Sequence, residues 1–199
     1  MNMIRFALAP LVAISLAVPA YADKIPLGEL SRYINSLQTA ESDFTQVNSD
    51  GTIATGRMYM KRPGRVRFEY APPDRTLVMA GEGQVAIFDP KSNQPPEQYP
   101  LSRTPLSLIL AKDVDLGRAK MVVGHTSDDK TTTVTAQDPE HPEYGTIKMV
   151  FTGQPTELRQ WVITDDAGGK TTVILADLKK GGTMSTSLFS LQGEIAKRK

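Results

Sequence analysis

Few side chains in this sequence have types and spacings suited to chemistry. The histidines His125 and His141 have no partner at metal-ligand spacing, and the chain contains no cysteine. The neighbouring carboxylates Asp128-Asp129 and Asp165-Asp166 lie where turns are expected, and aspartate commonly bonds the backbone of a turn. No serine-nucleophile elbow, phosphate-binding glycine loop or zinc-protease motif occurs. We therefore expect a protein that is not an enzyme and has no catalytic residue, metal site or cofactor.

The side chain with the clearest chemical requirement is Arg62, in the stretch "RMYMKRPGRVRFEY" at residues 57–70. This stretch alternates apolar and polar residues on both sides of a proline-glycine turn, which predicts a β-hairpin. Met58, Met60 and Arg62 share one face of the first strand, because successive side chains of a strand point to opposite faces. The direction in which Arg62 points therefore depends on the register of the hairpin.

Two loop lengths give two registers for this hairpin. A two-residue loop places Arg62 opposite Arg65 and both methionines opposite charged residues, and each such mispairing costs a few tenths to about 1 kcal/mol. A three-residue loop, Pro63-Gly64-Arg65, with Gly64 available for a positive φ angle, brings the apolar faces together. We predict the three-residue loop, in which the cross-strand pairs are Arg62 with Val66, Met60 with Phe68, and Met58 with Tyr70.

This register places Arg62 on the apolar face, at the end of its strand. An unpaired buried guanidinium is costly, so its N–H groups must reach water or find acceptors. The last carbonyls of a helix lack intrahelical partners and lie at the negative end of its dipole. We predict that Arg62 hydrogen-bonds to a short helix near residues 105–111 and holds it closed over a concavity. The alternative is that Arg62 extends from the sheet edge into solvent.

The elements that position these residues follow from the periodicity of the apolar side chains. Leu27, Leu30, Ile34 and Leu37 recur at helical spacing and predict one amphipathic helix. After this helix the pattern has a period of two, interrupted by turns rich in glycine and aspartate. It predicts strands at residues 42–48, 53–62, 65–71, 75–80, 84–89, 97–102, 119–126, 130–137, 145–152, 157–165 and 170–179, with a weaker candidate at 184–190.

A second, shorter helix interrupts the run of strands at "RTPLSLILAK". Thr104 suits its N-cap and Pro105 its first helical position, while Leu106, Ile109 and Leu110 share one face. We expect a large antiparallel sheet, strongly curved or partly closed, with two helices laid against its concave side.

The alternating strands carry a set of apolar residues that suits a binding surface. Methionine is unbranched and polarizable, and it lines surfaces that accept variable apolar shapes. The alternative for each residue is an ordinary packed core. A sheet of this size with only two helices has few side chains to fill its concavity, which favours a pocket lined by Met58, Met60, Val66, Phe68, Tyr70, Ile147, Met149, Phe151, Trp161 and Ile163.

The first 22 residues have the pattern of a secretory signal peptide. Arg5 precedes an apolar stretch of roughly 15 residues, shorter than the ~20 of a membrane-spanning helix, and Ala20-Tyr21-Ala22 has the small-x-small pattern of a cleavage site. An N-terminal membrane anchor is the alternative. Cleavage after Ala22 leaves residues 23–199 as a single domain, with 23 − 1 = 22 basic and 22 acidic residues. These charges are interspersed, so we expect no nucleic-acid partner.

Several short motifs follow one another along the chain: Phe44-Thr45-Gln46, Gly56, Lys61-Arg62-Pro63-Gly64, Arg67, Tyr70, Pro73, Gly83, Asp89, Thr104-Pro105-Leu106, Trp161, Asp165, Gly168 and Thr171. Each motif alone is loosely specific. Their order and spacing over roughly residues 25–180 together resemble the LolA family of periplasmic lipoprotein carriers.

This resemblance implies an α+β fold in which an incomplete, half-open antiparallel β-barrel carries a lid of short helices over an apolar cavity for acyl chains. It also implies that Arg62, the arginine of the Lys-Arg-Pro segment, acts in lid closure and cargo release.

We accordingly expect a periplasmic chaperone that binds the acyl chains of lipoproteins and carries them from the inner to the outer membrane. By resemblance, its partners are acylated lipoproteins, an inner-membrane lipoprotein-releasing transporter and an outer-membrane acceptor, and the chain acts as a monomer. The alternatives are a module of the same fold that binds free lipids, or a periplasmic sensor of envelope stress.

Overall fold

The computed structural model describes residues 24–198. The signal peptide that the sequence predicts at residues 1–22 therefore lies outside the described residues. Within residues 24–198, no helix has both the length and the apolar character needed to cross a membrane.

The central element of the described part of the chain is a twelve-stranded antiparallel sheet. Its strands alternate buried and more exposed side chains, as expected where one face covers a core. The strands are β1 (Thr39–Val47), β2 (Ile53–Lys61), β3 (Arg65–Tyr70), β4 (Leu77–Gly81), β5 (Gln84–Phe88), β6 (Glu97–Pro100), β7 (Val122–Ser127), β8 (Thr131–Gln137), β9 (Thr146–Thr152), β10 (Glu157–Thr164), β11 (Lys170–Leu175) and β12 (Lys179–Lys180).

The strand order shows that two meanders meet in the middle of this sheet. The order is β6-β5-β4-β3-β2-β1-β11-β10-β9-β8-β7, and β12 pairs with β1 beside β11. Strand β1 therefore joins the N-terminal half to the C-terminal half, with Phe44 opposite Leu175. In the described chain, β6 and β7 end the sheet without pairing to each other, so the predicted barrel is not closed.

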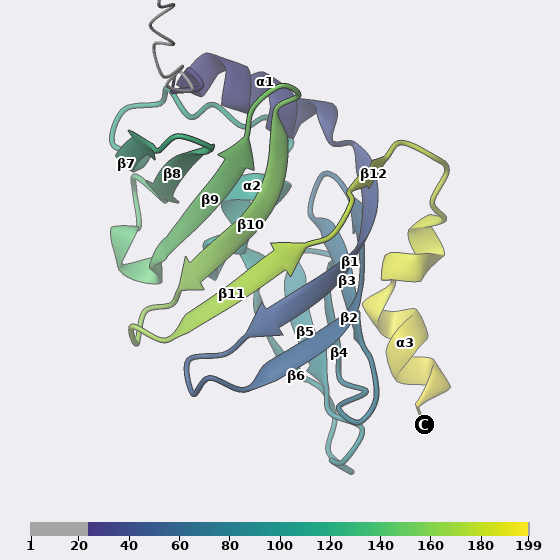
Figure 1. The fold of residues 1–199 in the computed structure, drawn as a ribbon. Coiled ribbons are helices and arrows are strands. Elements are labelled where there is room, and N and C mark those ends of the chain that lie inside the picture. The colour runs from purple at the N-terminus through teal and green to yellow at the C-terminus, as the bar shows by residue number, and fades with distance from the viewer. Residues whose placement is uncertain (1–23, 199) are drawn as a thin grey trace, which may run out of the picture.

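Short helices lie on both faces of the sheet. Helix α1 (Leu27–Ser36) crosses one end of the curved sheet, and α2 (Leu106–Leu110) lies inside the curve (Figure 1). Helix α3 (Leu191–Lys197) packs outside, against β4. Residues 24–198 also contain three 3₁₀ turns: η1 (Leu101–Arg103), η2 (Pro142–Tyr144) and η3 (Thr186–Phe189).

The register of the β2–β3 hairpin differs from the predicted one. Lys61 pairs with Arg65, so the three loop residues are Arg62-Pro63-Gly64, with Gly64 at φ 72°. The cross-strand pairs are Met60 with Val66, Met58 with Phe68, and Gly56 with Tyr70. The loop length and the positive φ were predicted correctly, but the pairing of Arg62 with Val66 was wrong. A shift of two residues keeps the same faces together, so alternation alone does not distinguish these two registers.

The C-terminal region also differs from the prediction. Residues 184–190 do not form a strand, because η3 occupies this stretch and α3 follows it. The Ser190 side chain accepts a hydrogen bond from the backbone of Gly193 and caps α3. A third helix was therefore missed, and it lies on the convex side of the sheet rather than on the concave side.

The start of α2 was predicted with the wrong cap. Pro105 precedes the helix as its N-cap residue, and no side chain caps that end. The Thr104 hydroxyl instead donates to the carbonyl of Leu101, at 2.9 Å. The remaining predicted strands are present with shifted ends, and the stretch 170–179 is divided between β11 and β12.

Candidate functional site

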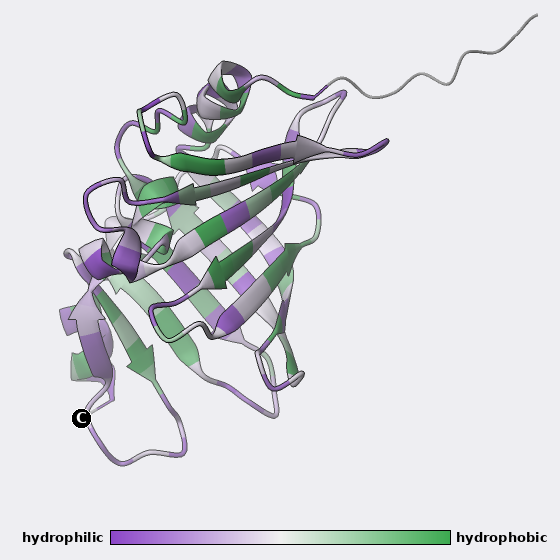
Figure 2. Cartoon of the chain, turned by 90° about the vertical axis from the view of Figure 1, so that its left-hand side faces the viewer, coloured by the Kyte–Doolittle hydropathy of each residue, from purple (hydrophilic) through white to green (hydrophobic). Residues whose placement is uncertain are grey.

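The residues predicted to line a pocket all belong to one hydrophobic cluster on the concave side of the sheet. Eight of the ten are buried, and Tyr70 and Ile163 are partly buried against the same cluster. Figure 2 shows the alternation along the strands that produces this face, with hydrophobic and hydrophilic residues following each other. The structure therefore brings residues from β2, β3, β9 and β10 together, although they are up to about a hundred positions apart in sequence.

The helices α1 and α2 cover this concave face directly. Leu106, Ile109 and Leu110 of α2 are buried in the same cluster as Met58 and Met60, and so are Leu30 and Ile34 of α1. The side chains predicted for the lid thus pack against the side chains predicted for the pocket. We call α1, α2 and the chain that follows α2 to residue 116 the lid.

An aromatic group inside this cluster includes one residue, Phe44, that was not predicted to line the site. The ring of Phe44 makes edge-to-face contacts with Phe68, at 5.3 Å between centroids, and with Tyr70, at 5.2 Å. Phe68 in turn contacts Trp161 at 6.3 Å. The alternation of β1 places Phe44 on the inner face, so its apolar type at that position was the available signal.

The guanidinium of Arg62 lies at the C-terminal ends of both lid helices. Its Nε donates to the carbonyl of Ala111 at 3.2 Å, and its Nη2 donates to the same carbonyl at 2.5 Å. Nη1 donates to the carbonyl of Ile34, and Nη2 also donates to Asn35 Oδ1 at 3.1 Å. Arg62 is only 4% exposed, so it does not extend into solvent as the alternative required. The predicted contact with the end of α2 is present, and a second contact with α1 accompanies it.

The acceptors around Arg62 are neutral. Backbone carbonyls at helix ends carry partial negative charge, which stabilises a guanidinium without a carboxylate. Burial lowers the pKa of Arg62, and the negative charge of Asp113 opposes that shift. The same turn is held to the lid by its backbone, since the amide of Gly64 donates to the carbonyl of Leu110 at 2.8 Å.

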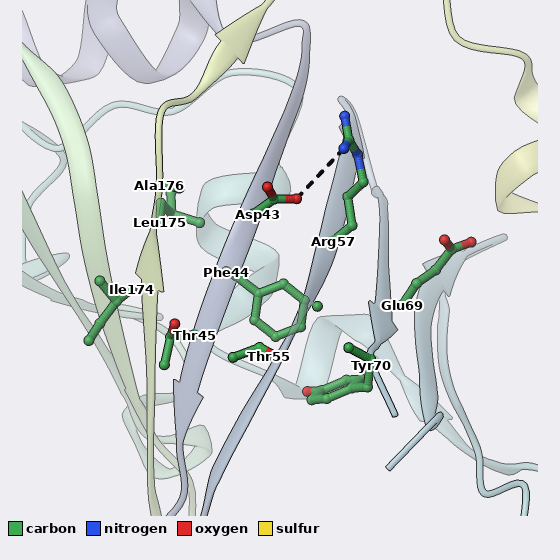
Figure 3. Close-up of a pocket in the computed structure, with 12 residues that line it drawn as sticks. Asp43, Phe44, Thr45, Thr55, Arg57, Glu69, Tyr70, Ile174, Leu175 and Ala176 are labelled. Carbon is green, nitrogen blue, oxygen red and sulfur yellow. Dashed lines mark ion pairs between the residues drawn. The ribbon is translucent and has the colours of Figure 1, made fainter. Parts of the chain in front are cut away.

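A cleft of about 740 Å³ is lined by residues of the neighbouring strands β11, β1, β2 and β3 and of the chain that follows β3 and β11. In Figure 3 the rings of Phe44 and Tyr70 border this cleft, and Arg57 forms an ion pair with Asp43 at its rim, at 3.6 Å. Tyr70 is the one predicted lining residue that borders it. The Tyr70 hydroxyl donates to Gln46 at 2.6 Å, and burial raises the pKa of Tyr70 to about 12.

One aspartate of each predicted pair bonds the backbone of a turn. Asp128 accepts from the backbone amides of Lys130 and Thr131, at 2.8 and 2.7 Å. Asp165 accepts from Ala167 and Gly169 in the same way. In residues 24–198, no group of three or more metal-ligating side chains is placed to hold a metal ion.

Comparison with known proteins supplies the family. The family model described as "Outer membrane lipoprotein carrier protein LolA" matches residues 35–192. The outer-membrane lipoprotein carrier protein of Chromohalobacter salexigens is 25% identical over 201 residues, which covers 96% of this chain and 94% of that protein. The one from Methylococcus capsulatus is 26% identical over 184 residues and covers 84% of each chain.

One solved structure similar to this chain is a LolA superfamily protein from Nitrosomonas europaea. The TM-score is 0.44 at 8% identity, and the match covers 84% of this chain and 99% of that one.

The family match spans both halves of the sheet, from the end of α1 to the start of α3. It includes the Arg62 turn, α2 and every strand whose side chains form the concave apolar face. Proteins of the matched family are periplasmic and non-enzymatic. This chain belongs to the LolA family of outer membrane lipoprotein carrier proteins.

Proposed function

We propose that this chain is a periplasmic chaperone that binds the acyl chains of lipoproteins and carries them from the inner to the outer membrane. The acyl chains bind on the concave apolar face when the lid moves away from it. The observation that carries this proposal is Arg62, a buried cation that ties the ends of two helices over a face of methionine, phenylalanine and tryptophan side chains.

The energetics of acyl-chain burial suit a face that is covered when cargo is absent. Burial of one 16-carbon chain is worth on the order of 10 kcal/mol, at about 0.8 kcal/mol per methylene. Such a gain alone would make release slow. Because Leu106, Ile109 and Leu110 pack on the same face, cargo must displace them, and their return on release recovers part of that burial. The net affinity for cargo is therefore the difference between the free energy of burying the acyl chain and that of burying the lid side chains.

Arg62 acts in this proposal as a latch on the closed lid. Its acceptors are carbonyls and an amide, which water can replace when the lid opens. The latch thus favours the closed state without making opening prohibitive. Loading takes place at an inner-membrane lipoprotein-releasing transporter and unloading at an outer-membrane acceptor, with the chain acting as a monomer.

The test of the latch is Arg62→Leu in a cargo-transfer assay. Purified protein is loaded with an acylated lipoprotein and then mixed with outer-membrane vesicles, and the transferred lipoprotein is quantified over time. We expect the variant to bind cargo and to deliver it at least about tenfold more slowly, the effect of ~1.4 kcal/mol. Arg65→Leu is the matched control, because Arg65 adjoins the same turn and, among residues 24–198, its side chain donates only to the carbonyl of Pro63. Delivery by Arg62→Leu at the wild-type rate would rule out the latch.

The cargo itself is tested by purifying the protein from periplasm and identifying what remains bound by mass spectrometry. Acylated lipoproteins are the expected result. Phospholipid without lipoprotein would instead identify a free-lipid carrier, and a bound signalling protein would identify a sensor of envelope stress.

A further inference from the structure

Two side chains of α1 hold the chain that follows α2. Asn35 Oδ1 accepts from the backbone amide of Val114 at 2.9 Å, and Asn35 Nδ2 donates to the carbonyl of the same residue, also at 2.9 Å. One turn earlier in α1, Ser31 Oγ accepts from the amide of Leu116 at 3.0 Å. Because Val114, Leu116 and Ser31 are buried, breaking these bonds would leave polar groups without partners away from water.

Helix α1 is also bound to the C-terminal half of the sheet. The hydroxyl of Tyr33 accepts from the amide of Leu158 at 3.0 Å, and the carboxylate of Glu29 accepts from the hydroxyl of Thr156 at 2.8 Å. Just before the helix, the amide of Ile25 donates to the hydroxyl of Thr132 in β8, at 3.0 Å. These three bonds attach α1 along its length to the region of β8 and β10.

The lid meets the N-terminal half of the sheet differently. Its polar contacts with the β2–β3 turn are those of the Arg62 side chain and of the Gly64 amide, which donates to Leu110 at 2.8 Å. The Arg62 amide also donates to the carbonyl of Gln38 at 2.8 Å, in the short link between α1 and β1. All these contacts lie at a single turn. Elsewhere on this side, α2 packs on β2 and β3 through apolar side chains such as Met58 and Met60.

We propose that Asn35 and Ser31 clasp α1 to residues 111–116, so that the lid opens as one body, parting from the β2–β3 turn and pivoting on β8–β10. This inference rests on the proposed function, because it concerns how the cargo face is exposed. Asn35 is a positioning residue, since its Oδ1 also accepts from Arg62 and holds the guanidinium toward Ala111. Acyl chains then enter beside Met58, Met60 and Val66.

Amide hydrogen exchange measured by NMR on cargo-free protein tests this proposal. The amide of Gly64 reports on the seam between the turn and the lid. The amides of Val114 and Leu116 report on the clasp, and that of Leu158 reports on the pivot. In Arg62→Ala we expect Gly64 to exchange at least about tenfold faster, as for loss of one hydrogen bond to a charged group. The other three amides should stay within about twofold of the wild type.

Asn35→Ala tests the clasp directly. We expect the amide of Val114 to exchange at least about tenfold faster while that of Leu158 is unchanged. Ser36→Ala is the matched control, because the Ser36 hydroxyl lies on the same helix and donates only to Tyr33 within it. Should Arg62→Ala fail to fold, Arg62→Lys can replace it, because lysine keeps the charge but has fewer N–H donors. We expect the exchange of Gly64 to be accelerated more than that of the other three amides in this variant too, with smaller changes throughout.

Equal acceleration at Gly64, Val114 and Leu116 in Arg62→Ala would show that α2 leaves α1, which overturns the proposal. Unchanged exchange of Val114 in Asn35→Ala would overturn it as well. Unchanged exchange of Gly64 in Arg62→Ala would show that the lid does not part from the β2–β3 turn, which also overturns the proposal. Failure of the carrier function would appear instead in the cargo-transfer assay, while this experiment contains no cargo.

Discussion

Two arginines in one hairpin, Arg62 and Arg67, hold helices on opposite faces of the sheet by different chemistry. Arg62 binds neutral carbonyls and the amide of Asn35 on the concave side. On the convex side Arg67 binds two carboxylates, Glu69 at 2.6 Å and Glu194 of α3 at 3.3 Å. Both side chains are largely removed from water, with Arg62 4% exposed and the Arg67 side chain 13% exposed. The two arginines differ in their partners. These partners determine the free energy needed to separate each arginine from the helix it holds.

We call the contact of Arg67 with Glu194 of α3 the convex joint, and the contacts of Arg62 with the lid the concave joint. The convex joint consists of paired charges, as expected for a permanent attachment. Glu194 is also bound by Arg198 at 3.0 Å, so removing either side of this network leaves a charge with fewer partners in a buried place. Beside it, Leu191 of α3 packs in a small second cluster with Leu77, Met79, Ala86 and Phe88. The concave joint has no such charge pairing. The helices that move in the proposed function are thus held by neutral acceptors, whereas α3 is held by ion pairs and its own apolar cluster.

The largest expected effect is on the convex side. Arg67→Met removes the cation between two carboxylates and leaves Glu194, whose side chain is 10% exposed, with fewer partners. We expect the free energy of unfolding to fall by about 3 kcal/mol, measured by urea denaturation. Arg57→Met is the control, because Arg57 forms its ion pairs with Glu41 and Asp43 in a more exposed place and should change stability by less than ~1 kcal/mol. Equal losses in both variants would remove the distinction between the joints.

A smaller effect is expected on the concave side. Arg62→Leu loses its hydrogen bonds, but the groups left behind are neutral carbonyls, and a buried charge is removed at the same time. We expect a loss of roughly 1–2 kcal/mol in the same denaturation experiment, together with the slow delivery described above. A loss as large as that of Arg67→Met would mean that Arg62 is a structural residue rather than a latch.

The smallest expected effect is on the pH dependence of stability. Burial raises the pKa of Glu194, but hydrogen bonds and charges from Arg198 and Arg67 outweigh it and lower the pKa below the ordinary 4.5. The folded state therefore binds this proton less readily than the unfolded state. The stabilisation is fully present above about pH 4.5 and is lost as the pH falls through the lowered value.

Glu194→Gln should accordingly flatten the acid side of the curve of unfolding free energy against pH. This curve is measured by urea denaturation between about pH 3 and about pH 7, a range that covers the titration of carboxylates. Arg62→Leu should leave that slope nearly as in the wild type, because the atoms that accept from Arg62 are carbonyls and an amide, and Asp113 acts on it only through its charge. A changed slope in Arg62→Leu, or an unchanged slope in Glu194→Gln, would contradict the assignment of charge to one joint and neutral acceptors to the other.

Much of the fold could be predicted because it depends on local patterns. The alternation along β2, β3, β9 and β10 identified the concave face, and the helical spacing of Leu27, Leu30 and Ile34 identified α1. The C-terminal helix α3 was missed because the local pattern there suggests a strand. Phe189 and Leu191 are two residues apart, as on one face of a strand, and only the Ser190 cap and the contact with β4 select a helix.

The arginine prediction shows the limit most clearly. The apolar pattern placed Arg62 near the concave side, although the register used to argue it was shifted, since the observed pairing of Met60 with Val66 satisfies the same pattern. Asn35 and Ser31 gave no signal at all, because a polar residue on a helix usually faces water. Their role appears only where α1 meets Val114 and Leu116.

The amino-acid sequence by itself determined which residues are apolar, with what period they recur, and hence which faces must be buried. Tertiary structure alone decided which carbonyls meet Arg62, which carboxylates meet Arg67, and which helix each arginine holds. The physical reason is that burial follows from the type and spacing of neighbouring residues, whereas a hydrogen bond between positions 35 and 114, or 67 and 194, requires the whole sheet to bring the two atoms within about 3 Å.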